Sequence, residues 1–414
     1  MSVTLTQPSN RILFFSERFH FRFAIACVVG MFAGLVLSRG VLSVSMIAMV
    51  VNGILYWIGA AQRGEKTWDW VYGVVGLLFI TYFLSGIYSD DKGYWLERLQ
   101  LKIPFLLLPI GFLPLKKTDR EFFHRLLSVF VIAILCSAVF VFVNYFLNRA
   151  DITYWTGEVM ETPYSHVRYS LMIAFVAFVA LHLFLEDFEW FSRFDKWIVA
   201  ACGLLLTVFL HVLAVRSGLV AFYLAVVILI VRFAWINGQW LSGLSFAVGF
   251  MLLPIMAYLF VPTFREKVSY MKYTVNEFFS GRDVSNLSDG QRLTSIQKGI
   301  DVFKAHPVLG VGAGDLPAAT QHAYHNDGTA HALPMPHNQW VWLLASVGLV
   351  GTLIIFFSLV FPIYYLRDDF NVLTVSFFTV IHTSLLTEAT LEEQIGSAFY
   401  LVFLLLFLTV YRRT

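Results

Sequence analysis

The sequence has few charged residues and few cysteines, and both shortages limit what the protein can be. Charged residues make up 14% of the chain, whereas a soluble globular domain carries about 25%. The net charge of +2 comes with no basic stripe of the kind that binds nucleic acid. The cysteines Cys27, Cys136 and Cys202 all lie within apolar runs and are too few for a disulfide framework. These shortages argue against a soluble domain, a nucleic-acid-binding protein and a disulfide-rich scaffold.

Apolar and aromatic residues are abundant instead. They include 41 Phe, 18 Tyr and 11 Trp, and hydrophobic residues as a whole make up 58% of the chain. Such residues fill lipid-facing surfaces and interfacial belts. The first residues show no apolar segment followed by a small-residue cleavage site. We therefore expect the first apolar stretch, which starts near Phe23, to remain in the protein as a membrane span.

The apolar runs predict an all-α polytopic membrane protein. A span needs about 20 mostly apolar residues, and reading with that length gives about twelve transmembrane helices. The fourth is short and contains Pro104, Pro109 and Pro114, which predicts a kink or an incomplete span. The predicted spans cover residues 22–38, 41–60, 68–87, 100–114, 122–147, 168–185, 197–214, 216–235, 239–262, 338–364, 370–388 and 395–411.

The distribution of Lys and Arg predicts the orientation. If the N-terminus is cytoplasmic, the inner segments hold about twice as many Lys and Arg residues as the short outer segments. This bias favours two cytoplasmic termini and places one large loop outside, which in a bacterial inner membrane means the periplasm. We expect three parts: 1–262 with transmembrane helices 1–9, 263–337 as a large periplasmic loop with short helices, and 338–414 with helices 10–12.

Arg216 is the first candidate site residue, at the junction of two apolar helices on the outer face. It is either an interfacial arginine that reaches water or an anion-binding group. If a helix starts at Arg216, its exposed N–H groups and positive dipole end lie beside a guanidinium suited to phosphate oxygens. Gly218 leaves room for the close approach of a ligand or another backbone.

Arg292 is the second candidate, in the large loop. Leu293, Ile296, Ile300 and Phe303 recur at spacings of three and four, which predicts a helix over 292–304 with its apolar stripe on the membrane or on neighbouring helices. Arg292 and Ser295 would lie on its flank. A charged residue on such a helix is usually solvated. The Gly-rich run at 310–314 predicts a tight return to the membrane and is no dinucleotide fingerprint, because no βαβ unit surrounds it.

His337 is the third candidate, where the loop returns to the membrane. Asn338 is a good N-cap for the following span, and Pro336 fixes the chain before it. Gly348 and Gly351 would let another helix pack closely. A lone histidine near an interface is more often structural, but its ordinary pKa near neutrality suits proton transfer.

Other polar residues give weaker signals. The spacing of His322, His325 and His331 matches no zinc signature, so we expect no metal site there. Glu388, Glu392 and Glu393 lie between the last two spans on the same outer face. We expect these carboxylates to be solvated, although one could orient an acceptor or His337.

The run from His337 resembles a family signature. His337-Asn338, nine residues and then Gly348-Leu349-Val350-Gly351-Thr352 match the pattern of the O-antigen ligase family: His, then Asn, Ser or Gln, nine residues, then Gly-x-x-Gly-Thr. Arg216 in an Arg-Ser-Gly turn and Arg292 before a His-Pro-x-x-Gly-x-Gly turn resemble the family's two arginines. The resemblance covers the second half of the chain, from about residue 200.

This resemblance implies a GT-C type membrane glycosyltransferase of lipopolysaccharide biosynthesis. The family moves a glycan from undecaprenyl pyrophosphate to a sugar hydroxyl of the lipid A core, with no nucleotide sugar, cofactor or metal. By resemblance His337, Arg216 and Arg292 are catalytic: the arginines stabilise the leaving pyrophosphate and His337 takes the proton in one inverting displacement. Ser217, Asn338 and Glu388 join the arginines as expected substrate-binding residues.

Two other readings stay open. O-antigen and exopolysaccharide polymerases of the same superfamily use the same donor and differ in the acceptor, which one sequence does not reveal. A transporter with twelve helices is the alternative from another class. Coupling sites of transporters usually place charges near the membrane midplane, whereas the candidate polar residues here gather at one face.

Overall fold

The computed structural model describes residues 16–116, 118–148, 160–280, 287–325 and 335–411. Within these ranges the chain is helical and contains no strand. Its helices are α1 (Glu17–Leu37), α2 (Arg39–Gln62), α3 (Trp70–Ser85), α4 (Lys92–Gly111), α5 (Arg120–Asn148), α6 (His166–Leu185), α7 (Asp195–Leu213), α8 (Arg216–Asn237), α9 (Trp240–Phe260), α10 (Pro262–Phe279), α11 (Ser288–Ala305), α12 (Leu316–His325), α13 (Gln339–Tyr365), α14 (Val372–Thr387) and α15 (Gln394–Val410), with the 3-10 turns η1 (Leu113–Leu115), η3 (Arg367–Asp369) and η4 (Thr390–Glu392).

The helices confirm the predicted all-α polytopic membrane fold. In the described part of the chain, nine helices are long and apolar enough to cross a membrane, and α3, α14 and α15 are shorter apolar helices. Together they coincide with the twelve predicted spans. The fourth span was placed wrongly at its start, because α4 begins at Lys92 and carries Lys102 in its middle. Residues 92–99 therefore belong to a helix and not to an outer connection.

The centre of the bundle is aromatic. Helix α15 is buried along nearly its whole length, and Phe403 on it stacks edge-on against Phe175 of α6 with ring centroids 4.9 Å apart. Phe377 of α14 joins the same group at 6.2 Å from Phe403. Lipid tails are as apolar as these side chains, so close packing and ring contacts, rather than removal from water, hold the helices together.

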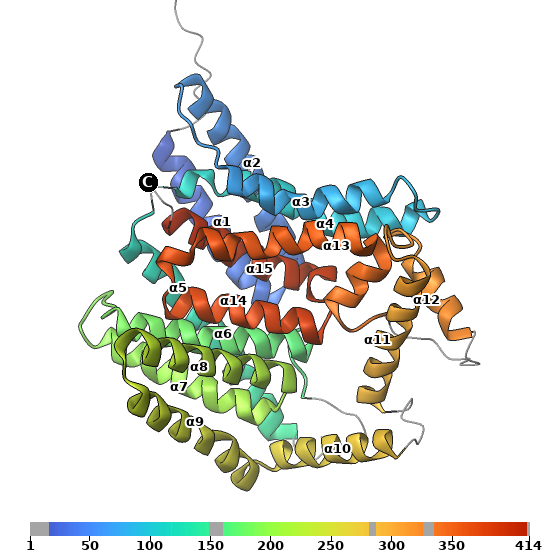
Figure 1. Cartoon of the computed structure of the whole chain (residues 1–414). Helices are drawn as coiled ribbons and strands as arrows, with labels where there is room; N and C mark the ends of the chain where they lie inside the picture. Colours follow the sequence, from blue (N-terminus) through green and yellow to red (C-terminus); the bar gives the residue numbers. More distant parts are fainter. Residues whose placement is uncertain (1–15, 117, 149–159, 281–286, 326–334, 412–414) are drawn as a thin grey trace, which may run out of the picture.

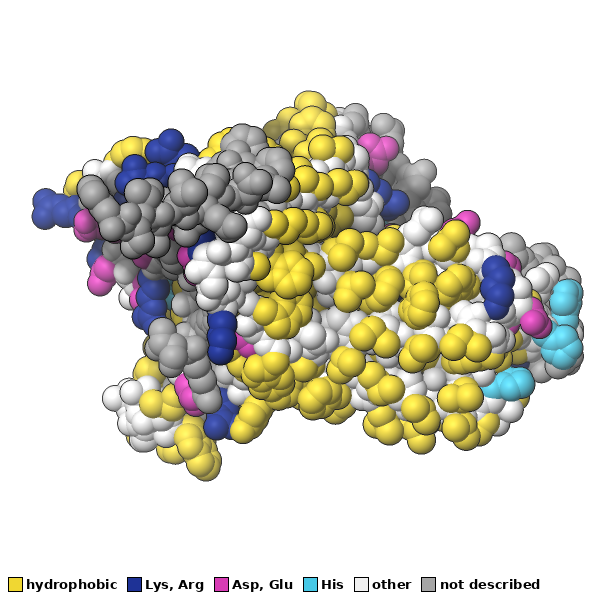
Figure 2. Space-filling view, turned by 90° about the horizontal axis from the view of Figure 1, so that it is seen from above, with side chains coloured by type: hydrophobic (Ala, Val, Ile, Leu, Met, Phe, Trp, Pro, Cys, Tyr) yellow, Lys and Arg dark blue, Asp and Glu magenta, His cyan; other side chains and the backbone are white. Residues whose placement is uncertain are grey.

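One end of the bundle gathers the polar candidates. Helices α6, α8 and α13 begin there and α14 ends there, with α11 and α12 lying across it (Figure 1). We call this the site end. In the view of Figure 2, apolar side chains cover the middle of the molecule, Lys and Arg gather at the opposite end, and histidines appear at the site end. The fold thus separates an apolar band from two polar ends.

The described residues of the large loop form three helices, α10, α11 and α12. The prediction of a helix over 292–304 is confirmed, and α11 extends it to Ser288–Ala305. Helix α10 was not predicted, because its polar composition hid a helical repeat. Phe264, Val268, Met271 and Val275 recur at spacings of three and four. Only Val261 separates α10 from the end of α9, so the ninth span leads directly into the loop (Figure 1).

Candidate functional site

A single carboxylate joins two of the predicted catalytic residues. Glu388 directly follows α14, and its side chain is only 10% exposed. One oxygen, Oε1, accepts a hydrogen bond from Arg292 Nη2 at 2.8 Å, and Oε2 lies 3.2 Å from His337 Nδ1. The structure therefore brings Arg292, Glu388 and His337 together from α11, the α14–η4 connection and the start of α13. The expectation of a solvated carboxylate at Glu388 is wrong.

The charge of Glu388 follows from its neighbours. Burial raises the pKa of this carboxyl group. The hydrogen bond from His337 and the charges of Arg292, His337 and Arg168 lower it by more, so the pKa lies below its ordinary value. Glu388 is thus ionised at neutral pH. An ionised carboxylate only accepts hydrogen bonds, so Nδ1 of His337 carries the proton. In neutral His337 this leaves a lone pair on Nε2.

The backbone around His337 is held from two sides. The His337 N–H donates to Ser295 Oγ of α11 at 3.2 Å, and Ser295 is fully buried rather than on an open flank. The Asn338 side chain accepts from the N–H groups of Trp340 and Val341, which confirms the predicted N-cap of α13. Its Nδ2 also donates to the Leu386 carbonyl at 2.8 Å. Position and direction of His337 are therefore fixed by helices from three parts of the chain.

Of the two signature glycines, Gly351 has the predicted role, because a Cβ there would lie 3.1 Å from Thr81 of α3, whereas Gly348 has a different one. Gly348 breaks α13 with φ 67° and ψ −171°, a conformation essentially restricted to glycine. A Cβ there would lie 2.3 Å from the Val308 carbonyl oxygen and 2.4 Å from Gly310 N, so a loop packs against Gly348 and not another helix. The N–H of Leu349 bonds Pro307 O at 2.9 Å. The kink thus seats the turn between α11 and α12 on α13, and the loop satisfies backbone groups that the kink releases.

The connection between α3 and α4 forms hydrogen bonds with the same turn. Asp315, just before α12, accepts the N–H groups of Asp90 and Asp91, both at 2.8 Å. The Gly314 N–H donates to Ser89 Oγ at 3.1 Å, and Tyr88 Oη donates to the Leu309 carbonyl at 2.8 Å. The Gly-rich return predicted from the sequence is therefore a docked turn, which ties α11 and its Arg292 to the transmembrane bundle.

A buried ion pair lies behind the site. The Lys102 side chain is 0% exposed and the Glu392 side chain 3%, and Lys102 Nζ is 3.1 Å from Glu392 Oε1. Tyr82 Oη and Gln339 Nε2 donate to the same oxygen at 2.5 and 2.9 Å. Gln339 Oε1 accepts the Leu391 N–H at 2.8 Å. The network joins α3, α4 and the start of α13 to η4, and the expectation of a solvated Glu392 is wrong.

Arg216 lies at the start of α8, as predicted. The helix begins at this half-buried residue, and α8 packs on both α6 and α14. A Cβ at Gly218 would lie 2.5 Å from Ser170 Oγ, so the glycine permits close packing on α6. Among the described residues, the buried Ser217 Oγ has no hydrogen-bond partner. The N-terminus of α8 therefore offers N–H groups, a guanidinium and a spare hydroxyl at the site end.

A second acidic residue of the α14–α15 connection binds two further arginines. Glu393 Oε1 lies 3.2 Å from Arg168 of α6, and Oε2 lies 3.7 Å from Arg39 at the start of α2. Half-exposed Glu393 thus pairs with cations, and is not simply solvated. Arg168 also lowers the pKa of Glu388. The six residues from Glu388 to Glu393 therefore connect the arginines beside Glu393 with the group formed by Arg292, Glu388 and His337.

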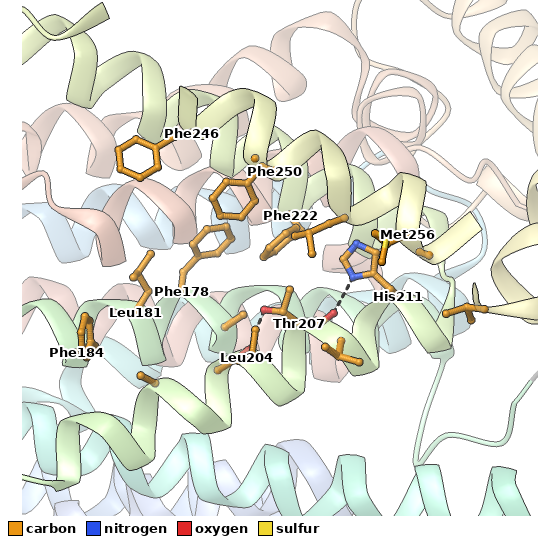
Figure 3. Close-up of a pocket in the computed structure, with 18 of the residues that line it drawn as sticks. Phe178, Leu181, Phe184, Leu204, Thr207, His211, Phe222, Phe246, Phe250 and Met256 are labelled. Carbon is orange, nitrogen blue, oxygen red and sulfur yellow. Dashed lines mark hydrogen bonds between the residues drawn. The ribbon is translucent and has the colours of Figure 1, made fainter. Parts of the chain in front are cut away.

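A long apolar cavity of about 710 Å³ opens between α6, α7, α8 and α9. Phe178, Phe222, Phe250 and Met256 point into it, and His211 and Thr207 are polar residues of its lining (Figure 3). His211 Nε2 bonds Tyr223 Oη at 2.5 Å. On α9 the lining residues run from Ser245 to Phe260, a rise of about 22 Å. The cavity therefore extends along most of the apolar band and reaches the end of α9 from which α10 starts.

Part of the chain matches a known protein family. Residues 199–356 match the family model described as O-antigen ligase. This segment belongs to the O-antigen ligase superfamily. The resemblance drawn from the signature is thereby confirmed, and the matched range contains Arg216, Arg292, His337 and the glycine pair of α13. No curated protein matches the chain.

The superfamily and the fold together define the protein in general terms. It is a multi-pass membrane protein with a domain of the O-antigen ligase and polymerase type, which is a glycosyltransferase-like enzyme class. Glu388 lies beyond the matched range, although it makes the contact that joins His337 to Arg292. Within the described ranges no three His, Cys, Asp or Glu residues form a group that could hold a metal ion, and His331 lies outside them.

Sequence reasoning missed the contacts that support the site. Nothing in the sequence singled out Gln339 or the contact between Ser295 and His337. A signal for the ion pair was present, because Lys102 lies in an apolar run and an intramembrane charge needs a partner. The partner's identity was not readable, since Glu392 is far away in the chain.

Proposed function

We propose that the protein is an O-antigen ligase-like glycosyltransferase that moves a glycan from undecaprenyl pyrophosphate to a sugar hydroxyl, with the lipid A core as acceptor. The observation that carries this proposal is the buried carboxylate of Glu388 between Arg292 and His337, beside the family signature. The site end then faces the periplasm, and both termini lie on the cytoplasmic side of the inner membrane.

His337 acts as the general base. His337 Nδ1–H donates a hydrogen bond to Glu388, so Nε2 accepts the proton of the acceptor hydroxyl as that oxygen attacks the anomeric carbon. The Glu388 carboxylate also stabilises the imidazolium that forms. Ser295 and Asn338 keep the residue in place through the backbone contacts described above. The arrangement resembles other base–carboxylate pairs, in which the acid orients the imidazole and stays ionised.

The arginines stabilise the leaving group. When the glycosidic C–O bond breaks, its electron pair goes to the pyrophosphate oxygen, which gains negative charge. Arg292 uses one nitrogen for Glu388 and has further N–H donors for phosphate oxygens. Arg216 adds its guanidinium to the N–H groups of α8, and Ser217 adds a hydroxyl. One direct displacement of this kind inverts the anomeric centre and needs no metal ion or cofactor.

The cavity between α6 and α9 accommodates the lipid carrier. Its apolar lining suits a polyprenyl chain, and its length of about 22 Å on α9 suits a chain longer than one leaflet. The cavity is also lined by α7 and α8, which meet at Arg216. A carrier in this cavity has its pyrophosphate at interface depth, near the start of α8.

Purified protein in nanodiscs tests the reaction class. Undecaprenyl-pyrophosphate-linked glycan is supplied with and without an acceptor, and released undecaprenyl pyrophosphate is measured. We expect release that depends on the acceptor and is lost in Arg216→Ala and Arg292→Ala, whose membrane insertion is unchanged. Movement of intact donor across the bilayer without release supports a transporter and contradicts the proposal.

Envelope glycans of a gene-deletion strain separate a ligase from a polymerase. A ligase deletion leaves the lipid A core without polymer while polymer accumulates on the carrier. A single repeat left on the core indicates an O-antigen polymerase. An unchanged ladder on the gel argues against both activities and refutes the assignment to lipopolysaccharide biosynthesis.

A further inference from the structure

A second apolar groove lies between α2, α4 and α15. These three helices are on the side of the bundle away from α9 (Figure 1). Its volume is about 460 Å³, and Met46, Val50 and Leu107 are among the residues that line it. Ser43 and Gln394 lie where α2 and α15 begin, and Gln394 Nε2 donates to Ser43 Oγ at 2.6 Å. The groove is therefore apolar along its length and polar at its site end.

The groove is too short for a chain that crosses both leaflets. Its lining residues on α2 run from Ser43 to Val51, which is a rise of about 12 Å. Half of a hydrocarbon core about 30 Å thick is about 15 Å. These dimensions fit one hydrocarbon chain of a lipid in the leaflet at the site end, whereas the cavity beside α9 is about twice as long.

Two arginine side chains lie near the polar end of the groove. Arg39 lies one helical turn before Ser43, with 60% of its side chain exposed, and Arg168 is the second cation beside Glu393. Two guanidinium groups against one carboxylate leave an excess positive charge. Within the described residues, Arg168 Nε is buried without a hydrogen-bond partner. An anionic head group, such as a sugar phosphate, complements this arrangement.

The same end of the groove adjoins the proposed catalytic site. Glu393 follows the connection that starts at Glu388, and Arg168 is close enough to both carboxylates to pair with one and lower the pKa of the other. A head group at Arg39 and Arg168 therefore lies beside the connection whose other end holds His337. An acceptor anchored in the groove needs no movement across the bundle to reach the base.

We propose that this groove binds an acyl chain of the acceptor, a phosphorylated glycolipid of the site-end leaflet, and that Arg39 and Arg168 bind its phosphate. The inference rests on the proposed function and makes the acceptor acylated rather than polyprenyl-linked. It assigns the two apolar spaces described above to the two lipid substrates: the long cavity to the donor and the short groove to the acceptor.

Cross-linking tests the occupant without requiring transfer. The full chain in nanodiscs is incubated with lipid A that carries a photoactivatable group in an acyl chain, and cross-linked peptides are identified. We expect labelling of α2, α4 and α15 that excess lipid A removes. If excess phosphatidylglycerol removes the labelling equally well, the groove binds ordinary bilayer lipid, which overturns the proposal. Removal by undecaprenyl phosphate, or labelling elsewhere only, also overturns it.

A matched pair of variants tests the effect on transfer. Val50 is half-buried and lines the groove, whereas Val44 on the same helix is 68% exposed and does not line it. We expect Val50→Trp to raise the KM of an acylated acceptor about tenfold, equivalent to losing about two buried methylene groups. The KM of the donor stays unchanged, and Val44→Trp behaves as the wild type.

A comparison of acylated and deacylated acceptors separates the groove assignment from the proposed enzymatic function. With a deacylated core glycan, wild type and Val50→Trp are expected to share one high KM. Equal KM values for acylated and deacylated acceptors in the wild type contradict the groove assignment. If no acceptor supports transfer while specific cross-linking persists, the proposed enzymatic function fails and the lipid site stands.

Discussion

Lys102→Met tests the buried ion pair behind the site. Lys102 and Glu392 have side-chain exposures of 0% and 3%, and their charged atoms are 3.1 Å apart. The substitution preserves most of the side-chain volume but leaves the Glu392 carboxylate buried without its nearest cation. Removing one partner of a buried pair costs about 3–5 kcal/mol, because the other charge stays desolvated. We expect Lys102→Met to lower the free energy of unfolding by that amount.

A second variant and a control separate this effect from a change of packing. Lys102→Met/Glu392→Gln removes both charges and keeps acceptors for Tyr82 and Gln339, so we expect it to recover most of the lost free energy. Lys196→Met breaks a surface pair with Asp187, whose side chain is 77% exposed. We expect a change of about 1 kcal/mol or less there.

Reversible unfolding in bicelles, followed by steric trapping, gives the free energies of all three variants. A loss below about 1 kcal/mol in Lys102→Met, equal to that of the surface control, would show that Glu392 is not held as a buried anion. No recovery in the double variant would show that packing, and not an unpaired charge, causes the loss. Either result refutes the account of the network.

Three further changes test how the site is held. Gln339→Met removes the hydrogen bonds that join the ion pair to α13, so we expect kcat for glycan transfer to fall about tenfold or more with donor KM unchanged. Gln62→Met, at the exposed end of α2, should keep the wild-type kcat; equal kcat values in both variants contradict a positioning role. Gly348→Ala puts a Cβ 2.3 Å from a carbonyl oxygen at positive φ, and a thermal shift assay should show a large loss of stability that is absent in Gly73→Ala, where a Cβ meets nothing within 4 Å. Because the pKa of Glu388 is lowered in the fold, its ionised form stabilises the protein above the ordinary value of 4.5, and this contribution disappears as the pH falls through the lower folded value. Unfolding of wild type and Glu388→Gln from pH 7 to 3 should therefore show a constant difference down to about pH 5 that shrinks below 4.5; a difference independent of pH throughout contradicts the assignment.

The sequence was sufficient for the fold because membrane spans obey a local rule. About 20 apolar residues in a row form a helix wherever they occur, since the bilayer leaves no other way to satisfy the backbone. The start of α8 at Arg216 and the cap at Asn338 were also predictable, because both depend on residues next to each other. Helix α4 was misplaced at its start because its first two turns carry Lys92, Glu97 and Arg98 and read as a polar connection.

The parts of the site that the sequence did not predict depend on contacts between distant segments. Glu388 comes after the matched family range, and only the antiparallel packing of α13 and α14 places it beside His337. Gly348 was expected to admit a helix, yet the structure seats the turn around Gly310 there. A glycine shows where a close approach is possible, but the sequence does not say which segment approaches.

The central claim is that His337 takes the proton of the acceptor hydroxyl at the site end. It is tested by single-turnover release of undecaprenyl pyrophosphate from a glycan-linked donor in the presence of acceptor. His337→Ala is compared with His306→Ala, which removes an exposed histidine after α11. We expect the rate to fall about 10²–10⁴-fold in His337→Ala, with donor binding retained, and to stay at the wild-type value in His306→Ala. A wild-type rate in His337→Ala contradicts the account.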